Sequence, residues 1–201
     1  MSRLIAAAGL AALLAAAAGA GTVEGEWSSK LAVASTAERV ISSWPDLARS
    51  AARNMMAKYG KPDEVGEDAL VWYGNGPWKK SIVHRRAWPH YSYMKDKDYL
   101  ENTIGYAVPN DKLEDLTRFD KKLDVDQASA ELSSRSDSEA MNYLALNLAD
   151  EIVKGKRTVD EAREFAKKSA RLMAAGKSSP YLNGFQFDVH NDASFNPWSR
   201  R

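Results

Sequence analysis

The chain has 201 residues, with 28 Lys and Arg against 27 Asp and Glu, and it contains no cysteine. This balanced charge argues against a general nucleic-acid binder, which needs a net basic surface to capture phosphates. The missing cysteine excludes thiolate nucleophiles, disulfide bonds and cysteine-based zinc sites, and there is no P-loop, Rossmann glycine pattern or HExxH motif. We therefore expect neither a cofactor nor a nucleic-acid partner.

The N-terminus has the pattern of a secretory signal peptide. Arg3 precedes an uncharged apolar run from Leu4 to Ala18, and small residues follow. This run is shorter than the roughly 20 residues that usually span a membrane. We expect cleavage after Ala18 or Ala20, no transmembrane span after cleavage, and a periplasmic or secreted protein. The alternative is an Ala-rich helix that is retained.

The rest of the sequence predicts four regions with no internal repeat. These are a signal peptide at residues 1–20, a mobile lead at 21–36, a single domain at 37–190 and a loose tail at 191–201. Predicted helices outnumber predicted strands, and the strands come mostly in one block. The expected fold class is therefore α+β, with a small antiparallel sheet packed against several helices.

The first predicted elements of the domain are two helices. A helical pattern begins near Ala37, and a second helix is predicted over residues 46–59 because Pro45 suits a first-turn position. Gly60 and Pro62 are typical of a helix end followed by a turn.

A hairpin and a third strand are predicted next. Residues 70–73 and 81–86 have extended patterns on either side of the turn formed by residues 75–77. A further strand is predicted over residues 103–108, where Pro109 stops it.

The second half of the domain is predicted to be mainly helical. Asn110 is expected to cap a short helix that ends near Phe119, and residues 129–133 are expected to be extended. Ser136 and Glu139 have capping-box spacing at the start of a helix that reaches about residue 154. The apolar residues of this helix lie on most sides of it, which predicts a central position in the domain. They include Met141, Leu144, Leu148 and Ile152.

A last helix and strand complete the prediction. Thr158 and Glu161 have the same capping-box spacing, and the helix they begin is expected to end near residue 175. Phe185, Phe187 and Val189 alternate as in a final strand.

Residues 57–65 and 70–73 carry a resemblance to a known family. They contain Tyr59-Gly60-Lys61-Pro62 and then Leu70-Val71-Trp72-Tyr73. The segment resembles the helix, turn and strand of the SmpA/BamE-like small envelope proteins. That resemblance implies an accessory, non-catalytic binding module in outer-membrane assembly. It covers about 30 of the 201 residues, and this chain lacks the lipidated cysteine of that family.

The chain taken whole also resembles a family of exported bacterial proteins of uncharacterised activity. The stretches that carry this likeness are residues 76–79, 106–109 and 143–149. The resemblance implies one domain in the cell envelope and supplies no activity.

Three histidines raise the question of a metal site. His84 and His90 are six residues apart, which in one straight strand separates them by about 20 Å. A bend at Trp88-Pro89 would be needed to bring them to one ion, and His190 could then join with Asp188 or Asp192. Because zinc needs three or four converging ligands, we favour unrelated surface histidines and expect no metal.

A cluster of basic and aromatic residues surrounds the second hairpin strand. Its candidate binding residues are Trp78, Lys79, His84, Arg85, Arg86, Trp88 and His90. Arginine forks and aromatic faces suit acidic protein patches, glycans and anionic headgroups. The alternative is a hairpin with inward aromatics and solvated cations.

These observations favour an exported, non-enzymatic binding or structural protein of the bacterial cell envelope. Its expected partner is an envelope protein, a glycan or an anionic headgroup. The alternative is a periplasmic hydrolase or metal-dependent enzyme that uses His84 and His90.

Overall fold

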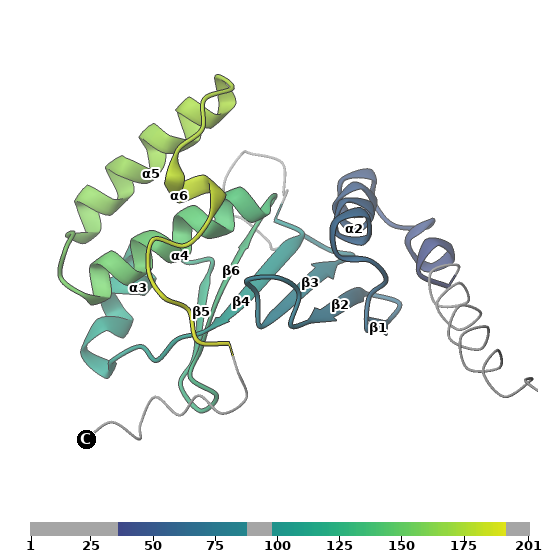
Figure 1. Ribbon diagram of the computed structural model, residues 1–201, viewed down its shortest axis with the longest axis horizontal. Helices are drawn as coiled ribbons and strands as arrows, with labels where there is room; N and C mark the ends of the chain where they lie inside the picture. Colours follow the sequence, from purple (N-terminus) through teal and green to yellow (C-terminus); the bar gives the residue numbers. More distant parts are fainter. Residues whose placement is uncertain (1–35, 88–97, 192–201) are drawn as a thin grey trace, which may run out of the picture.

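A computed structural model describes residues 36–87 and 98–191 and shows an α+β fold, as predicted (Figure 1). Six antiparallel strands form one sheet in the order β1-β2-β3-β4-β6-β5. The strands are β1 (Glu64–Val65), β2 (Ala69–Tyr73), β3 (Lys80–His84), β4 (Leu100–Gly105), β5 (Leu123–Asp126) and β6 (Glu131–Ser136). The helices are α2 (Asp46–Tyr59), α3 (Leu113–Phe119), α4 (Glu139–Val153), α5 (Val159–Ala174) and α6 (Pro180–Asn183). The predicted signal peptide lies outside the described residues.

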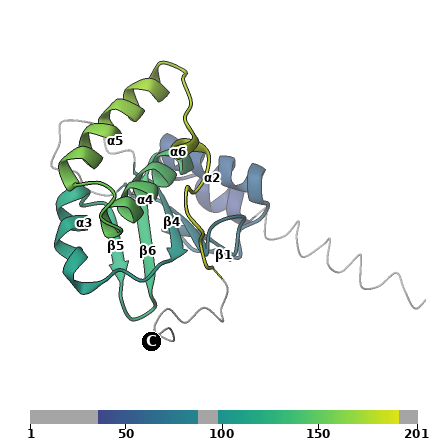
Figure 2. The same cartoon turned by 60° about the vertical axis from the view of Figure 1, so that its left-hand side comes forward.

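The main helices lie on one face of the sheet. Register aligns Leu70, Val83, Leu100 and Ser136 across four neighbouring strands, and all four are buried. Side chains alternate between the two faces of a strand, so the intervening residues face the other way. α2 and α4 pack over the buried face, and α5 and α6 contact the outer side of α4 (Figures 1 and 2). The opposite face is called the open face below, because no helix of the described chain lies on it.

Two apolar clusters fill the space between the sheet and the helices. The larger one joins Leu144 and Leu148 of α4 to Ile104 and Leu132 of the sheet. The smaller one lies under α2 and the helical residues 36–41 that precede it, and it contains the buried side chains of Leu70 and Trp72. Ten of the fifteen residues of α4 are buried, which confirms its predicted central position.

The segment from α2 into β2 has the predicted order of helix, turn and strand. α2 ends at Tyr59, and Gly60 adopts a φ of 81°, a conformation that residues with a side chain rarely adopt. The indole Nε1 of Trp72 donates a hydrogen bond to the Gly60 carbonyl at 3.0 Å. β2 and β3 then pair as the predicted antiparallel hairpin.

The first of the two predicted capping boxes is wrong. Ser136 is the last residue of β6, and its hydroxyl donates to the Ser138 carbonyl at 2.8 Å. α4 therefore begins at Glu139, with Ser138 as its N-cap. The second box is confirmed, because Thr158 and Glu161 exchange side-chain to backbone hydrogen bonds at the start of α5.

Other boundaries also differ from the prediction. β4 begins three residues earlier than expected and ends at Gly105, and β6 covers residues 131–136 instead of 129–133. Pro109, not Asn110, is the N-cap of the short 3-10 turn before α3. β5 and α6 were not predicted.

The predicted strand at residues 185–189 does not form. The Phe185 ring packs against Trp78 and Tyr143, with centroid distances of 5.1 and 4.9 Å. Asn191 continues this attachment, because its side chain accepts from the Gly105 N–H at 2.9 Å and donates to the Pro77 carbonyl at 2.6 Å. The alternating aromatic residues thus anchor an irregular segment along the fold and do not extend the sheet.

Candidate functional site

Trp78 belongs to the core and not to an exposed surface. Its side chain is fully buried, and its ring lies 4.5 Å from that of Tyr143 between centroids. The indole Nε1 donates to Glu139 Oε1 at 2.6 Å. The turn that joins β2 to β3 therefore packs inward against α4, which removes Trp78 from the candidate binding surface.

Glu139 joins three separate parts of the fold. Besides the Trp78 indole, its carboxylate accepts from Tyr59 Oη and Lys58 Nζ at 2.6 Å each. Burial lowers the pKa of Lys58, but the hydrogen bond and charge of Glu139 outweigh burial and raise it above its usual value. Burial and Glu139 both raise the pKa of Tyr59. The carboxylate thus holds the end of α2 and the hairpin turn on the first residue of α4.

Lys79 is partnered by an acidic residue of the sheet. Its amine lies 2.9 Å from Glu131 Oε1, and the amine of Lys80 lies 3.9 Å from Glu131 Oε2. This ion pair occupies the β6 end that is far from His84, so Lys79 is separated from the rest of the predicted cluster.

His84, Glu101 and Arg135 form an ion cluster on the open face. They lie on β3, β4 and β6 respectively. Each is next in sequence to a buried residue that faces the helices, so its own side chain is on the open face. His84 Nε2 is 2.9 Å from Glu101 Oε2, Arg135 donates to the same oxygen at 2.6 Å, and Arg135 also contacts His84 Nε2. Burial would raise the pKa of Glu101, but hydrogen bonds and charge from His84 and Arg135 lower it to about 2. Glu101 is therefore a permanent carboxylate near neutral pH.

An open groove of about 550 Å³ lies beside this cluster. It is lined by Asp68, His84, Arg86, Ala87 and Arg135, and it is called the basic groove below. Arg86 is exposed at the groove. The neighbouring Arg85 instead approaches the acidic loop before β2, with distances of 3.4 Å to Glu67 and 3.7 Å to Asp68. The structure thus brings together two of the predicted residues, His84 and Arg86, and adds Arg135, which lies far away in the sequence.

The remaining predicted residues do not complete a metal site. Trp88 and His90 lie outside the described residues. His190 lies next to Gly105, at the end of β4 opposite to His84, and five residues of strand separate these ends by about 17 Å. No group of three or more His, Asp or Glu side chains that could hold a metal ion occurs within residues 36–87 and 98–191.

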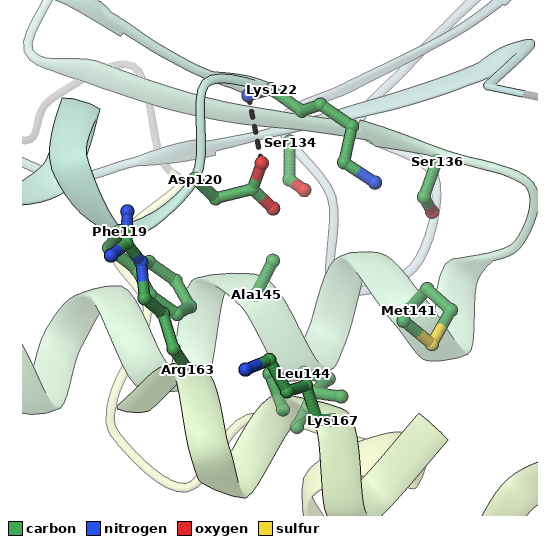
Figure 3. A pocket seen from close by; sticks show the side chains of 11 residues that line it. Phe119, Asp120, Lys122, Ser134, Ser136, Met141, Leu144, Ala145, Arg163 and Lys167 are labelled. Carbon is green, nitrogen blue, oxygen red and sulfur yellow. Dashed lines mark hydrogen bonds between the residues drawn. The ribbon is translucent and has the colours of Figure 1, made fainter. Parts of the chain in front are cut away.

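A second hollow lies on the helix-covered side and was not predicted. It has a volume of about 370 Å³ and lies between the end of α3, β6, α4 and α5 (Figure 3). Ser134 and Ser136 of β6 point into it from the sheet, and Ala145 points into it from α4 (Figure 3). The residues come from separate elements at irregular sequence spacing, so no local motif could reveal them. The polar pattern of β6, with three buried serines, was the only signal.

The comparisons with known proteins leave the family open. No family model, no curated protein and no solved structure matches the chain. Among the helices that the structure describes, none combines the length and apolar character needed to cross a membrane.

Proposed function

We propose that the chain is an exported, non-enzymatic binding protein of the cell envelope that recognises an acidic partner at the basic groove. The N-terminal apolar run supports export, as argued from the sequence. The chemistry of the groove supports an acidic partner, whether a protein patch, a glycan or a headgroup. The likeness to small envelope proteins remains part of this proposal.

The observation that carries the proposal is the position of Arg86. Arg86 is exposed, and it lines the groove together with His84 and Arg135. An arginine fork binds carboxylates and phosphates through paired hydrogen bonds. Glu101 neutralises part of the charge of Arg135 from within the sheet, and the side chain of Arg135 is only 13% exposed. Arg86 is thus the cation of the groove that an acidic partner reaches most directly.

The chemistry of the ion cluster favours binding over catalysis. A general acid or base must change protonation near the working pH. Glu101 does not, because its pKa is about 2. His84 Nε2 is also engaged by Glu101 and Arg135. The alternative, a periplasmic hydrolase or metal-dependent enzyme using His84 and His90, would require this cluster to open.

Binding to poly-L-glutamate at several salt concentrations tests the proposal. We expect the purified protein to bind this probe with an affinity that falls as salt rises, since exposed charges are screened. Arg86→Gln should weaken binding several-fold without shifting the melting temperature, because an exposed charge contributes little to stability. Arg171→Gln is the matched control, an exposed arginine on α5. Equal effects of the two substitutions, or no effect of Arg86→Gln, would contradict the proposal.

A further inference from the structure

The hydroxyl of Ser134 is buried and has no hydrogen-bond partner. Ser134 is 1% exposed, and its Oγ is one of four orphaned buried side-chain atoms in the described chain. Leaving a buried hydroxyl unsatisfied destabilises the folded state, so such atoms are rare in folded proteins. Ser134 is followed by Ser136, whose hydroxyl has a partner in the Ser138 carbonyl. The two serines face the same cavity, but only that of Ser134 remains unpaired (Figure 3).

The cavity in front of Ser134 has an apolar wall opposite the sheet. Met141, Leu144 and Ala145 of α4 form this wall, and Phe119 and Ala166 extend it. Its volume of about 370 Å³ is many times the roughly 30 Å³ that one water molecule occupies in the liquid. Small-molecule sites begin at about 300 Å³ and combine apolar walls with a few polar groups. The cavity has both properties.

The charged residues of the cavity are mostly basic. Lys122, Arg163 and Lys167 line it together with one acid, Asp120. One oxygen of the Asp120 carboxylate accepts from the Lys122 backbone N–H at 3.0 Å, and the three cations outnumber this single acid. Lys122 lines the same cavity as Ser134, and its amine is 3.8 Å from Asp98 (Figure 3).

The ion pairs of the two α5 cations are exposed, and Arg163 also donates a hydrogen bond to the Arg118 carbonyl. Lys167 pairs with Glu164, and the side chains are 62% and 74% exposed. Arg163 lies 3.8 Å from Asp160, whose side chain is 85% exposed. Exposed ion pairs of this kind contribute little, so an anionic ligand can compete for both cations.

A neighbouring cavity provides a useful contrast. It lies between α2 and α4 and has a volume of about 450 Å³, but none of its lining residues carries an orphaned buried atom. Its one cation, Lys58, is paired with Glu139 at 2.6 Å, and Asp137 is its other acid. Size alone therefore does not distinguish a ligand site in this protein, whereas the unpaired hydroxyl in a cavity lined by three cations and one acid does.

We propose that the cavity between β6, α3, α4 and α5 binds a small amphipathic carboxylate. The apolar part of the ligand lies against α4, and its carboxylate accepts hydrogen bonds from the Ser134 hydroxyl and the Lys122 amine. Arg163 and Lys167 supply further positive charge at the rim. This site is separate from the basic groove, since the two lie on opposite faces of the sheet. It would give the protein a second, small-molecule ligand.

The test is a titration followed by amide NMR, with decanoate as the probe and decanol as its uncharged match. We expect decanoate to shift the amide signals of β6 and α4 at concentrations below its micelle threshold, and to bind at least tenfold more tightly than decanol. Ser134→Ala and Lys122→Gln should each weaken decanoate about tenfold, the usual effect of losing a hydrogen bond to a charged group, and leave decanol unchanged. Lys121→Gln is the control, because Lys121 is exposed and does not line the cavity.

Two further measurements separate a ligand site from a structural role. Ser134→Ala should leave the melting temperature unchanged or raise it, because it removes an unpaired buried hydroxyl. Ala145→Phe should block the cavity and abolish the binding of both probes. The proposal is overturned if decanoate produces no shifts, if the shifts centre on the basic groove, or if Ser134→Ala and Lys122→Gln bind decanoate as the unaltered protein does. A lower melting temperature for Ser134→Ala would also contradict it, since the hydroxyl would then be structurally paired.

Discussion

At the scale of single residues, Glu101 links the charged side chains on the open face of the sheet. Its carboxylate lies between His84 and Arg135, and its side chain is 19% exposed. The sequence pointed to His84 as part of a basic cluster but did not indicate either partner, because Glu101 and Arg135 come from strands that are 17 and 51 residues away. The strand register brings the three residues together. It places Glu101 and Arg135 beside Ile82, and His84 lies two residues further along β3 on the same face of the sheet.

The lowered pKa of Glu101 predicts a specific pH dependence of stability. The carboxyl has a pKa of about 2 in the folded protein and an ordinary value of 4.5. The unfolded chain therefore binds more protons between these values, so the stabilisation from Glu101 is complete above about pH 4.5 and is lost as the pH falls toward 2. Glu101→Gln should lower stability at pH 7 and flatten its slope between pH 4.5 and 2.

Urea unfolding over a series of pH values measures this effect. The matched control is Glu114→Gln, which changes an exposed glutamate of α3. An unchanged slope in Glu101→Gln would show that the ion cluster does not hold the carboxylate in its charged form.

At the scale of secondary structure, local sequence patterns predicted where helices and strands form better than they predicted which residues contact one another. The bounds of α2 and the presence of the β2–β3 hairpin followed from glycine, proline and alternating residues. The structure confirms both, although β3 covers residues 80–84 instead of 81–86. The strand predicted at residues 185–189 failed because an alternating aromatic pattern suits any segment whose rings face a core. Phe185 and Phe187 meet Trp78, Tyr143 and Tyr106 without any strand pairing.

The first capping box failed for a related reason. The sequence spacing paired Glu139 with Ser136. In the structure its carboxylate instead accepts hydrogen bonds from the buried indole of Trp78 and from two groups at the end of α2. The second box has no such competitor at Glu161, and it formed as predicted. A pattern read along the chain cannot weigh a partner 61 to 81 residues away.

Glu139→Ala should therefore destabilise the protein far more than the loss of a helix cap. It leaves the Trp78 indole buried without an acceptor and removes the acidic partner of Lys58, and we expect a loss of about 2–4 kcal/mol in the free energy of unfolding. Glu139→Gln, which keeps an acceptor, should lose less. Chemical denaturation measures both, with Glu164→Ala as the control because its ion pair with Lys167 is exposed. Similar small losses in all three variants would refute the linking role of Glu139.

At the scale of the whole molecule, the two candidate sites lie on opposite sides of one sheet. β6 contributes to both, because successive residues of a strand point to opposite faces. Arg135 lines the basic groove on the open face, and its neighbours Ser134 and Ser136 line the cavity under the helices. Of these residues, the sequence singled out Ser136, and only as a helix cap. The groove was partly predicted through His84 and Arg86, since charge clustering is visible in a sequence. The cavity was not, since it depends on how four elements pack.

Site-specific photo-crosslinking in living cells tests whether the basic groove recognises an envelope partner, as proposed. A photo-reactive residue would replace Ala87, which lines the groove, or Ala174, an exposed alanine on α5. We predict one reproducible adduct from position 87 in the envelope fraction, carried by a chain that has lost residues 1–18 or 1–20, and none from position 174. The absence of an adduct at position 87, the same adducts from both positions, or an adduct carried by a chain that keeps its N-terminal residues would contradict the account.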